Sequence, residues 1–463
     1  MKPNRSYRLL GVAAVLTLVA CSSLLDVKNP NAITENDLDN PKSAANQANG
    51  VLGSVARAWG QILTPYTMAT DELSWIGSRD AWQNLDQGTL SDPTNEFVDA
   101  AFFYVGEARW WSDQTIRRLE GFASRGVLAD SNALARTYLY AALIYTMIGN
   151  LFDNFPIGSS RDTSAAALGA TKMDSVYTVA ESYATKAMTI AQSFGDSSLE
   201  LDATAARATA RYYRALWAKL NNPPPGAVPV ASPLVNDAGA VADANAALAL
   251  ATALKAPDWR FQFHYSPTTV STDIGFEVNE REEMRIGGVY VYPSCTASPC
   301  GGTSNTIEVD SLKLADPIDA IPDPELTRFL LDPTDGFLNN TRYGPLTILS
   351  ARELHLIVAE AALAAADDVG FQSAINAERT LDNLTAYTGT GPTALAMLEY
   401  ERQRNLFMQG KRLFDEYRFG VNADLWAAGS EAITTPGTFL PITISERISN
   451  SFCLADPNSC GGR

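Results

Sequence analysis

Apolar residues recur at helical spacing along most of the chain, and one long irregular stretch interrupts them before the C-terminal third. Residues 132–149 (NALARTYLYAALIYTMIG) are apolar on nearly every face, so we expect this helix at the centre of the fold. Short connections predict that it pairs with the two following helices as antiparallel hairpins. The spacing predicts helices over 41–59, 97–124, 132–149, 174–194, 202–220, 239–254, 351–367 and 393–418.

Local signals refine this helical pattern. Asp174 and Asp202 stand where N-caps are expected, because a carboxylate there accepts from unpaired backbone N–H groups. No clean repeat of tetratricopeptide length is present. The sequence nevertheless predicts a mainly α, tetratricopeptide-like scaffold of helical hairpins. Small residues on the helix faces would let the axes approach closely, and these are Ala135, Ala141, Ala142, Ala187, Ala205 and Ala208.

The interruption over 257–345 is rich in Gly, Pro, Thr and aromatic residues and has no helical periodicity. Loops longer than about 15 residues inside compact domains are usually functional or disordered, and many aromatic residues argue against disorder. Residues 61–96 and the tail from Gly420 also have the composition of loops. We therefore expect a helical region over 41–256, a large loop-rich insert, and a C-terminal region over 346–463.

The N-terminus has the pattern of a secretory signal over 1–20. The apolar run 9–20 is too short to cross a bilayer core of about 30 Å. Residues 18–21 (LVAC) resemble a bacterial lipobox, which implies cleavage before Cys21 and acylation of that cysteine. An ordinary signal peptide with an incidental cysteine is the alternative. Residues 21–40 would then form a polar, lipid-anchored tether. The basic residues of the signal are Lys2, Arg5 and Arg8.

The remaining four cysteines form two close pairs in Pro-containing segments. An exported chain meets an oxidising compartment, so we expect local disulfides Cys295–Cys300 and Cys453–Cys460. The alternative is a four-cysteine zinc site, but neither spacing is the one that zinc knuckles favour.

The charge balance excludes some partners. The chain has 52 acidic and 35 basic residues, for a net charge of −17, and its basic residues do not cluster. Phosphate binding needs such clusters, so we expect no nucleic-acid partner. The same charge argues against electrostatic docking on an anionic membrane, which leaves the N-terminal lipid as the membrane contact.

No motif of a known catalytic or nucleotide-binding site is present: GxSxG, a P-loop, HExxH, GxGxxG and CxxC are all missing. The only two histidines, His264 and His355, are expected to pack or to form hydrogen bonds. We therefore expect binding without catalysis, no cofactor and no metal site. Neighbouring carboxylates occur by chance among so many acidic residues, and the pairs are Asp71 with Glu72, Glu96 with Asp99, and Glu282 with Glu283.

Several C-terminal segments resemble the SusD/RagB family. The helix 352–361 (RELHLIVAEA) resembles a helix of that family, and 374–379 resembles the helix that follows it. Residues 401–415 (ERQRNLFMQGKRLFD) are similar to its E-R-x-x-E-L-x-x-E-G-x-R-x-x-D signature. Here Asn405 and Gln409 replace the usual glutamates, which weakens two expected polar contacts. Further similarities are at 21–27, after the lipobox, and at Pro441, Ile442, Glu446 and Asn450.

These signature residues also have a purely structural interpretation. Leu354, Ile357 and Val358 would form the core stripe of one helix, and Arg402 and Asp415 would lie near the polar edge of another. We expect the signature to be scaffold.

The resemblance implies a surface-exposed outer-membrane lipoprotein that binds glycans or other nutrient oligomers. Its implied partner is a SusC-like TonB-dependent transporter. The alternatives are a helical-repeat scaffold that binds only proteins, and a lipoprotein hydrolase. The chemical identity of the ligand stays open.

Aromatic residues in the irregular segments are the candidates for ligand binding. Sugars stack their apolar faces on such rings and need polar groups beside them. The alternative for each ring is packing in the core or at an interface. The predicted ligand-binding residues are Trp75, Arg79, Trp82 and Asn84, with Tyr290 and Tyr292 as second candidates.

Overall fold

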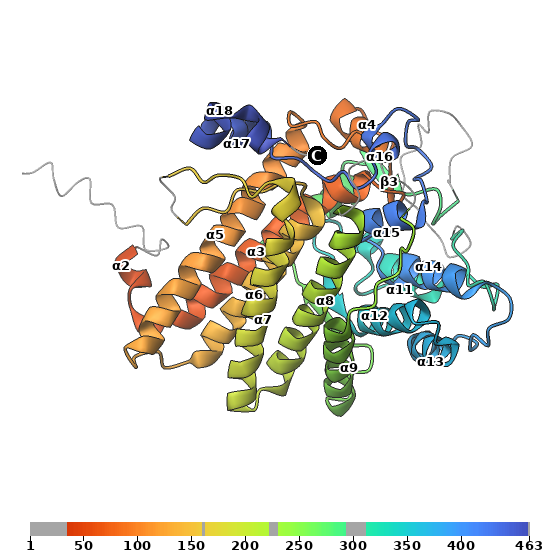
Figure 1. Cartoon of the computed structure of the whole chain (residues 1–463), viewed down its shortest axis with the longest axis horizontal. Helices are drawn as coiled ribbons and strands as arrows, with labels where there is room; N and C mark the ends of the chain where they lie inside the picture. Colours follow the sequence, from red (N-terminus) through yellow and green to blue (C-terminus); the bar gives the residue numbers. More distant parts are fainter. Residues whose placement is uncertain (1–34, 160–162, 222–229, 293–311, 462–463) are drawn as a thin grey trace, which may run out of the picture.

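Helices make up most of the structure, a computed structural model that describes residues 35–159, 163–221, 230–292 and 312–461 (Figure 1). The prediction of a mainly α fold is confirmed. Within the described ranges, no helix combines the length and the apolar character needed to cross a membrane. The first half contains α2 (Glu35–Leu38), η1 (Pro41–Ser43), α3 (Ala44–Met68), β1 (Leu73–Trp75), α4 (Asp80–Asp86), α5 (Glu96–Ser124), α6 (Ser131–Leu151), η2 (Ala170–Lys172), α7 (Asp174–Phe194), α8 (Ser197–Asn221) and α9 (Ala238–Ala253).

The long helices α5 to α9 form a stack in which each packs against the next one along the chain, while α3 packs against α5 and α6. Alanines such as Ala141, Ala187 and Ala208 are fully buried in this stack, and their small side chains allow the helices to approach closely. The predicted hairpin scaffold is confirmed. The connection between α6 and α7 is not short, however, because residues 152–173 form a long segment.

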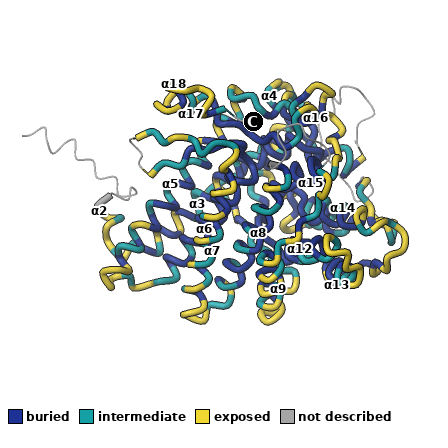
Figure 2. Tube along the Cα trace, in the orientation of Figure 1, coloured by how far each residue is buried: buried dark blue, intermediate teal, exposed yellow. Residues whose placement is uncertain are grey.

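The core lies where the apolar pattern predicted it. Figure 2 shows buried residues along the inner faces of the stacked helices. Nearly every residue of α6 from Ala133 onward is buried, which confirms its predicted central position. From Ala133 to the end of this helix, Arg136 is the one residue that is only half-buried. Helices α3, α5, α7 and α8 pack around it.

One early helix is longer than predicted. α3 continues to Met68 instead of ending near residue 59, and Pro65 lies inside it. Its last two turns bury Ile62, Leu63 and Tyr66, and this packing extends the helix through residues that have the texture of a loop. Helix α4 also falls within the predicted loop over 61–96, so only part of that segment is irregular.

Neither predicted aspartate N-cap is observed. Helix α7 begins at Asp174 itself, with Met173 in the cap position. Helix α8 begins more than a turn before Asp202, which therefore lies inside the helix. Burial raises the pKa of Asp202 to about 7, and the charge of Asp196 adds to this effect.

The insert over 257–345 is more regular than predicted. It contains β2 (Arg260–Phe263), α10 (Asp273–Asn279), β3 (Met284–Ile286), α11 (Pro324–Leu331) and η4 (Phe337–Asn339). Strand β3 pairs antiparallel with β1, and β2 pairs antiparallel with β4 (Leu346–Ser350), with a register shift after Phe261. The hydrophobic alternation over such short strands is too weak to be seen in the sequence. These pairs join the insert to both ends of the chain.

The C-terminal part contains two helices where one was predicted. The segment 393–418 divides because Met408 and Gly410 both have positive φ angles, 53° and 66°. A Cβ at Gly410 would lie 2.7 Å from the ring of Trp59, so this turn needs glycine. The elements here are α12 (Ala351–Ala364), α13 (Asp368–Arg379), η5 (Thr380–Asp382), α14 (Ala394–Asn405), α15 (Arg412–Phe419), α16 (Glu431–Thr434), α17 (Ile444–Ser449), α18 (Ser451–Ala455) and η6 (Pro457–Cys460).

Candidate functional site

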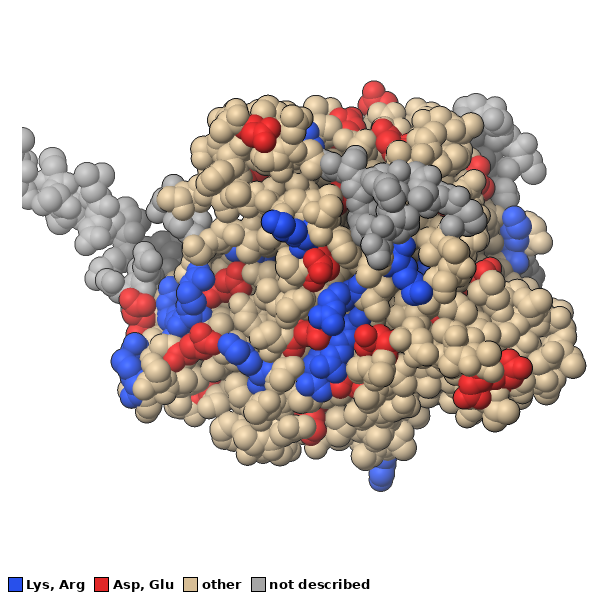
Figure 3. Space-filling model, in the orientation of Figure 1, with Lys and Arg blue, Asp and Glu red and all other residues tan. Residues whose placement is uncertain are grey.

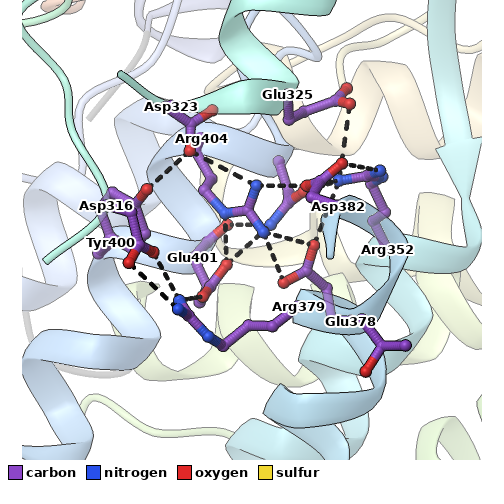
Figure 4. Close-up of polar contacts among 12 residues, drawn as sticks. Asp316, Asp323, Glu325, Arg352, Glu378, Arg379, Asp382, Tyr400, Glu401 and Arg404 are labelled. Atoms are coloured by element: carbon purple, nitrogen blue, oxygen red, sulfur yellow. Dashed lines mark hydrogen bonds and ion pairs between the residues drawn. The ribbon is translucent and has the colours of Figure 1, made fainter. Parts of the chain in front are cut away.

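Charged side chains are buried together where α12, α13 and α14 meet (Figure 4). The Arg352 guanidinium lies 2.6 Å from the Asp382 carboxylate, and Arg404 Nη2 donates to both oxygens of Glu378 at 2.9 Å. Arg379 and the other two arginines are at most 1% exposed, so water cannot screen these pairs. The remaining labelled members are Asp316, Asp323, Glu325, Tyr400 and Glu401.

This buried ion network has a structural role. Each arginine has carboxylate partners from other segments, and removing one partner would leave buried charge unpaired. Arg402 and Asp415, predicted at a polar edge, are in fact buried and paired, with Nε 2.8 Å from the carboxylate. Asn405 still accepts from Arg352 at 2.9 Å and donates to Glu401, so this departure from the family signature keeps its polar contacts.

The neighbouring carboxylates noted in the sequence are also engaged in structural contacts. Asp71 forms two hydrogen bonds with Arg412, at 2.8 and 2.6 Å. Glu72 accepts from the backbone N–H of Met408 at 2.6 Å, and burial raises its pKa to about 8. Glu283 accepts from the backbone N–H groups of residues 78 and 79.

The two histidines differ: His264 is exposed and does not pack as expected, whereas His355 is half-buried on α12. Burial lowers the pKa of His355 to about 4, so this side chain is neutral at pH 7. Asp99 accepts from the backbone N–H of Ser445 at 3.1 Å. In the described part of the chain, no group of three or more His, Cys, Asp or Glu side chains is arranged to hold a metal ion.

Two of the predicted ligand-binding aromatics lie in the core. Trp82 is 0% exposed and stacks on Phe97, with ring centroids 3.6 Å apart. Tyr290 is also 0% exposed, and its hydroxyl donates to Asp71 at 3.3 Å. Neither ring offers a face to a ligand in this structure, so we remove both from the predicted site. The physical reason is tertiary packing: Trp82 fills the space between α4 and α5, and Tyr290 packs against the ring of Phe407, with centroids 4.5 Å apart.

The other predicted residues lie nearer the surface. Trp75 is half-buried, its backbone N–H donates to Asp86 at 2.9 Å, and its indole N–H has no hydrogen-bond partner among the described residues. Arg79 lies over the ring of Phe97, 5.2 Å from its centroid, and Asn84 is exposed on α4. These three residues belong to one local unit, because α4 packs on β1.

Tyr292 does not join this unit. It is 57% exposed, but it follows the end of β3 that pairs with Leu73, whereas Trp75 pairs with Met284 at the other end. The structure therefore divides the predicted aromatic site into a Trp75–Arg79–Asn84 surface and a separate exposed tyrosine.

One predicted disulfide is confirmed. Cys453 and Cys460 are bonded, and this bridge closes the turn between α18 and η6. The predicted Cys295–Cys300 bond and the lipidated Cys21 lie outside the described residues.

A groove of about 490 Å³ lies along α5, where no site was predicted from the sequence. Phe103 and Trp110 are seven residues apart on one helical face, with Gly106 between them and Trp111 beside them. The volume is within the roughly 300–1,000 Å³ of small-molecule sites. A signal was present in the sequence: two aromatic runs, FFY and WW, interrupt the polar side of the helix over 97–124.

Polar contacts hold the opposite walls of this groove in place. Arg109, 6% exposed, donates to the carbonyl of Gly158 and pairs with Asp113 at 3.2 Å, which ties the segment after α6 to α5. Asn450 at the end of α17 donates to the carbonyl of Ala165 at 2.8 Å. We call this site, lined by α5, the segment after α6, and α17, the α5 groove (Figure 1).

Comparison with solved structures identifies the fold. The chain is similar to a SusD superfamily protein from Bacteroides fragilis, with a TM-score of 0.56 and 14% identity over 91% of this chain and 99% of that one. A SusD homologue from Bacteroides thetaiotaomicron matches with a TM-score of 0.57 and 15% identity, covering 90% and 97%. A SusD superfamily protein from Bacteroides vulgatus matches with a TM-score of 0.53 and 12% identity, covering 88% and 97%.

The fold is therefore the SusD-like fold, and it extends over almost the whole described chain. The resemblance to SusD/RagB seen in the C-terminal segments is confirmed at the level of the fold. No family model matches the sequence, and no curated protein matches it.

Proposed function

We propose that this chain binds oligosaccharides or other nutrient oligomers at the cell surface and delivers them to a SusC-like TonB-dependent outer-membrane transporter. The observation that supports this most is a SusD-like fold that covers nearly the full length of both this chain and its structural neighbours. In this role the chain binds and releases its ligand without catalysing a reaction, because binding and release need no reacting group.

The first proposed ligand surface is formed by Trp75, Arg79 and Asn84. The half-buried indole offers part of a ring for stacking against a sugar, and the exposed amide of Asn84 supplies both a donor and an acceptor. Such an open surface makes few contacts, so we expect dissociation constants on the order of µM to mM for short oligosaccharides. Tyr292, a second exposed ring, is a separate candidate contact.

The proposed location is the outer membrane, with acylated Cys21 as the anchor. One acyl chain holds a protein only marginally and two hold it stably, so Cys21→Ala should release the protein into the soluble fraction. The net charge of −17 would oppose adhesion to an anionic leaflet. A mutant that still sediments with membranes after a high-salt wash would contradict lipid anchoring.

Two measurements test the proposed function. The first is calorimetric binding of a panel of oligosaccharides to the purified chain, with Trp75→Ala expected to weaken binding while leaving the melting temperature nearly unchanged. Phe194→Ala is the matched control, because this ring is 63% exposed at the C-terminal end of α7. No binding of any sugar would refute oligosaccharides as the ligand class, and the transporter measurement would then test the rest of the proposal.

The second measurement is affinity purification of the tagged protein from native membranes in mild detergent. We expect a TonB-dependent barrel to co-purify, through an interface of at least about 1,000 Å². Recovery of the lipoprotein alone, with the barrel gene expressed, would favour the stand-alone scaffold.

A further inference from the structure

The α5 groove presents aromatic rings that the core does not use. The side chain of Phe103 is 65% exposed, and Trp110 and Trp111 are both half-buried in an edge-to-face pair with ring centroids 5.0 Å apart. A large ring exposed inside a concavity, rather than singly on a convex surface, is typical of a binding site. Flat rings of this kind stack against the apolar C–H faces of sugars.

Glycine keeps the floor of the groove open. Gly106 lies in the middle of α5, where glycine weakens a helix relative to alanine. Its φ angle is not positive, and a Cβ there would meet nothing within 4 Å, so neither the backbone nor the packing requires glycine. The consequence of having no side chain is free space between Phe103 and Trp110.

The polar groups of the groove favour a ligand with many hydroxyls and no negative charge. Glu446 accepts from Asn450 through one oxygen, and Glu107 pairs only loosely with Arg57, at 3.7 Å. Both carboxylates keep acceptor capacity for sugar hydroxyls. Arg109, the one cation among the described lining residues, is already held by Asp113 and by a backbone carbonyl, so it offers little to an anionic ligand.

We propose that the α5 groove is a second binding site, specific for neutral oligosaccharides. This inference rests on the proposed function and extends it, because the groove is built from α5, the segment after α6 and α17, and none of these contains Trp75, Arg79 or Asn84. Uronic-acid oligomers are excluded by the two carboxylates on its walls.

Substitutions at two positions test the groove with little risk to the fold. Phe103→Ala removes an exposed ring, and Gly106→Leu fills the groove without deleting any contact. Gly121→Leu is the matched control on the same helix, because a Cβ there meets only the side chain of Arg125, at 3.6 Å. Circular dichroism and melting temperatures establish that all the variants are folded.

The probes are maltohexaose, laminarihexaose, cellohexaose, xylohexaose and, as the acidic comparison, hexagalacturonate. We expect at least one neutral hexaose to bind the wild-type chain and to shift its tryptophan emission. Phe103→Ala and Gly106→Leu should each raise its Kd about tenfold or more, while Gly121→Leu leaves it within about twofold. Hexagalacturonate should not bind.

The possible failures are distinguishable. Unchanged affinity in both groove variants, with loss of binding in Trp75→Ala, overturns the second site and leaves the proposed function standing. Failure of the wild-type chain to bind any neutral hexaose overturns the second site, and a TonB-dependent barrel that still co-purifies leaves the proposed function standing. Tighter binding of hexagalacturonate contradicts the neutral class. Loss of the barrel partner from Gly106→Leu, with sugar affinity intact, shows that the groove is a protein contact.

Discussion

The stack α6–α8 and the group α12–α15 bury their helices in opposite ways. The stack is packed with alanine, and an ion pair between α7 and α8 lies at its rim, where Arg214 pairs with Glu181 at 2.7 Å while remaining 40% exposed. In the C-terminal group, Arg404 and Glu401 pair at 2.5 Å with both side chains 0% exposed. Figure 3 shows acidic and basic side chains lying close together over the surface of the stack.

The comparison teaches that the two regions depend on different physical quantities. The stability of the stack depends on the volume of its buried side chains, because close helix packing leaves no room for an added methylene. The stability of the group α12–α15 depends on every buried charge keeping its partner, because a buried charge without its partner is far more costly than a missing contact at the surface. Substitutions that change only volume or only charge should therefore separate the two regions.

The largest expected effect is in the buried ion network. Arg404→Met should lower the free energy of unfolding by about 3–5 kcal/mol, because Glu378, Glu401 and Asp382 lose a shared cation. Denaturant unfolding followed by circular dichroism measures this. A loss below about 1 kcal/mol would show that the network is hydrated.

The second largest loss of stability is expected when a larger side chain is placed inside the stack. Ala187→Leu, at a fully buried position of α7, should cost about 1–3 kcal/mol by displacing the neighbouring helices. Ala253→Leu, at the exposed end of α9, is the control and should be close to neutral. Equal melting temperatures for the two variants would contradict close packing in the stack.

The buried carboxylate Glu72 should make stability depend on pH. Its pKa is about 8 in the folded chain because of burial, against 4.5 for the ordinary group. Between these values the folded state holds a proton that the unfolded state has lost, so stability is full below pH 4.5 and falls as the pH rises towards 8. The slope from this group is at most about 1.4 kcal/mol per pH unit.

Glu72→Gln should flatten that decline, because the amide keeps an acceptor for the N–H of Met408 and does not titrate. The measurement is the melting temperature from pH 5 to 8 for both proteins. Some slope should remain, because burial also raises the pKa of Glu416. Identical slopes in variant and wild type would mean that Glu72 is ionised in the fold.

The smallest effect is expected at the rim of the stack. Arg214→Met removes an ion pair that water screens, so it should cost only about 0.2–1 kcal/mol. Measured beside Arg404→Met, it compares the same substitution in the two regions. Similar losses of stability in the two variants would contradict the distinction between the stack and the C-terminal group.

Much of the helical architecture could be predicted from the sequence, because helical periodicity is a local signal. The central helix and α7 are good examples, and the close spacing of Cys453 and Cys460 was enough to predict their bond. The split between α14 and α15 could not be predicted, because it depends on Trp59, which is far away in the sequence. The burial of Trp82 has the same origin, since its stacking partner belongs to the next helix.

By itself, the sequence determined the helical class, one disulfide and the resemblance to SusD/RagB, and it predicted an export signal, since these depend on spacing within short segments. Only the tertiary structure decided which aromatic rings are exposed and which charges are buried. Trp82 and Phe103 are both large aromatic residues of the N-terminal half, yet one is enclosed and the other is 65% exposed. Contacts between segments far apart in the chain determine that difference, and periodicity within one segment contains no information about them.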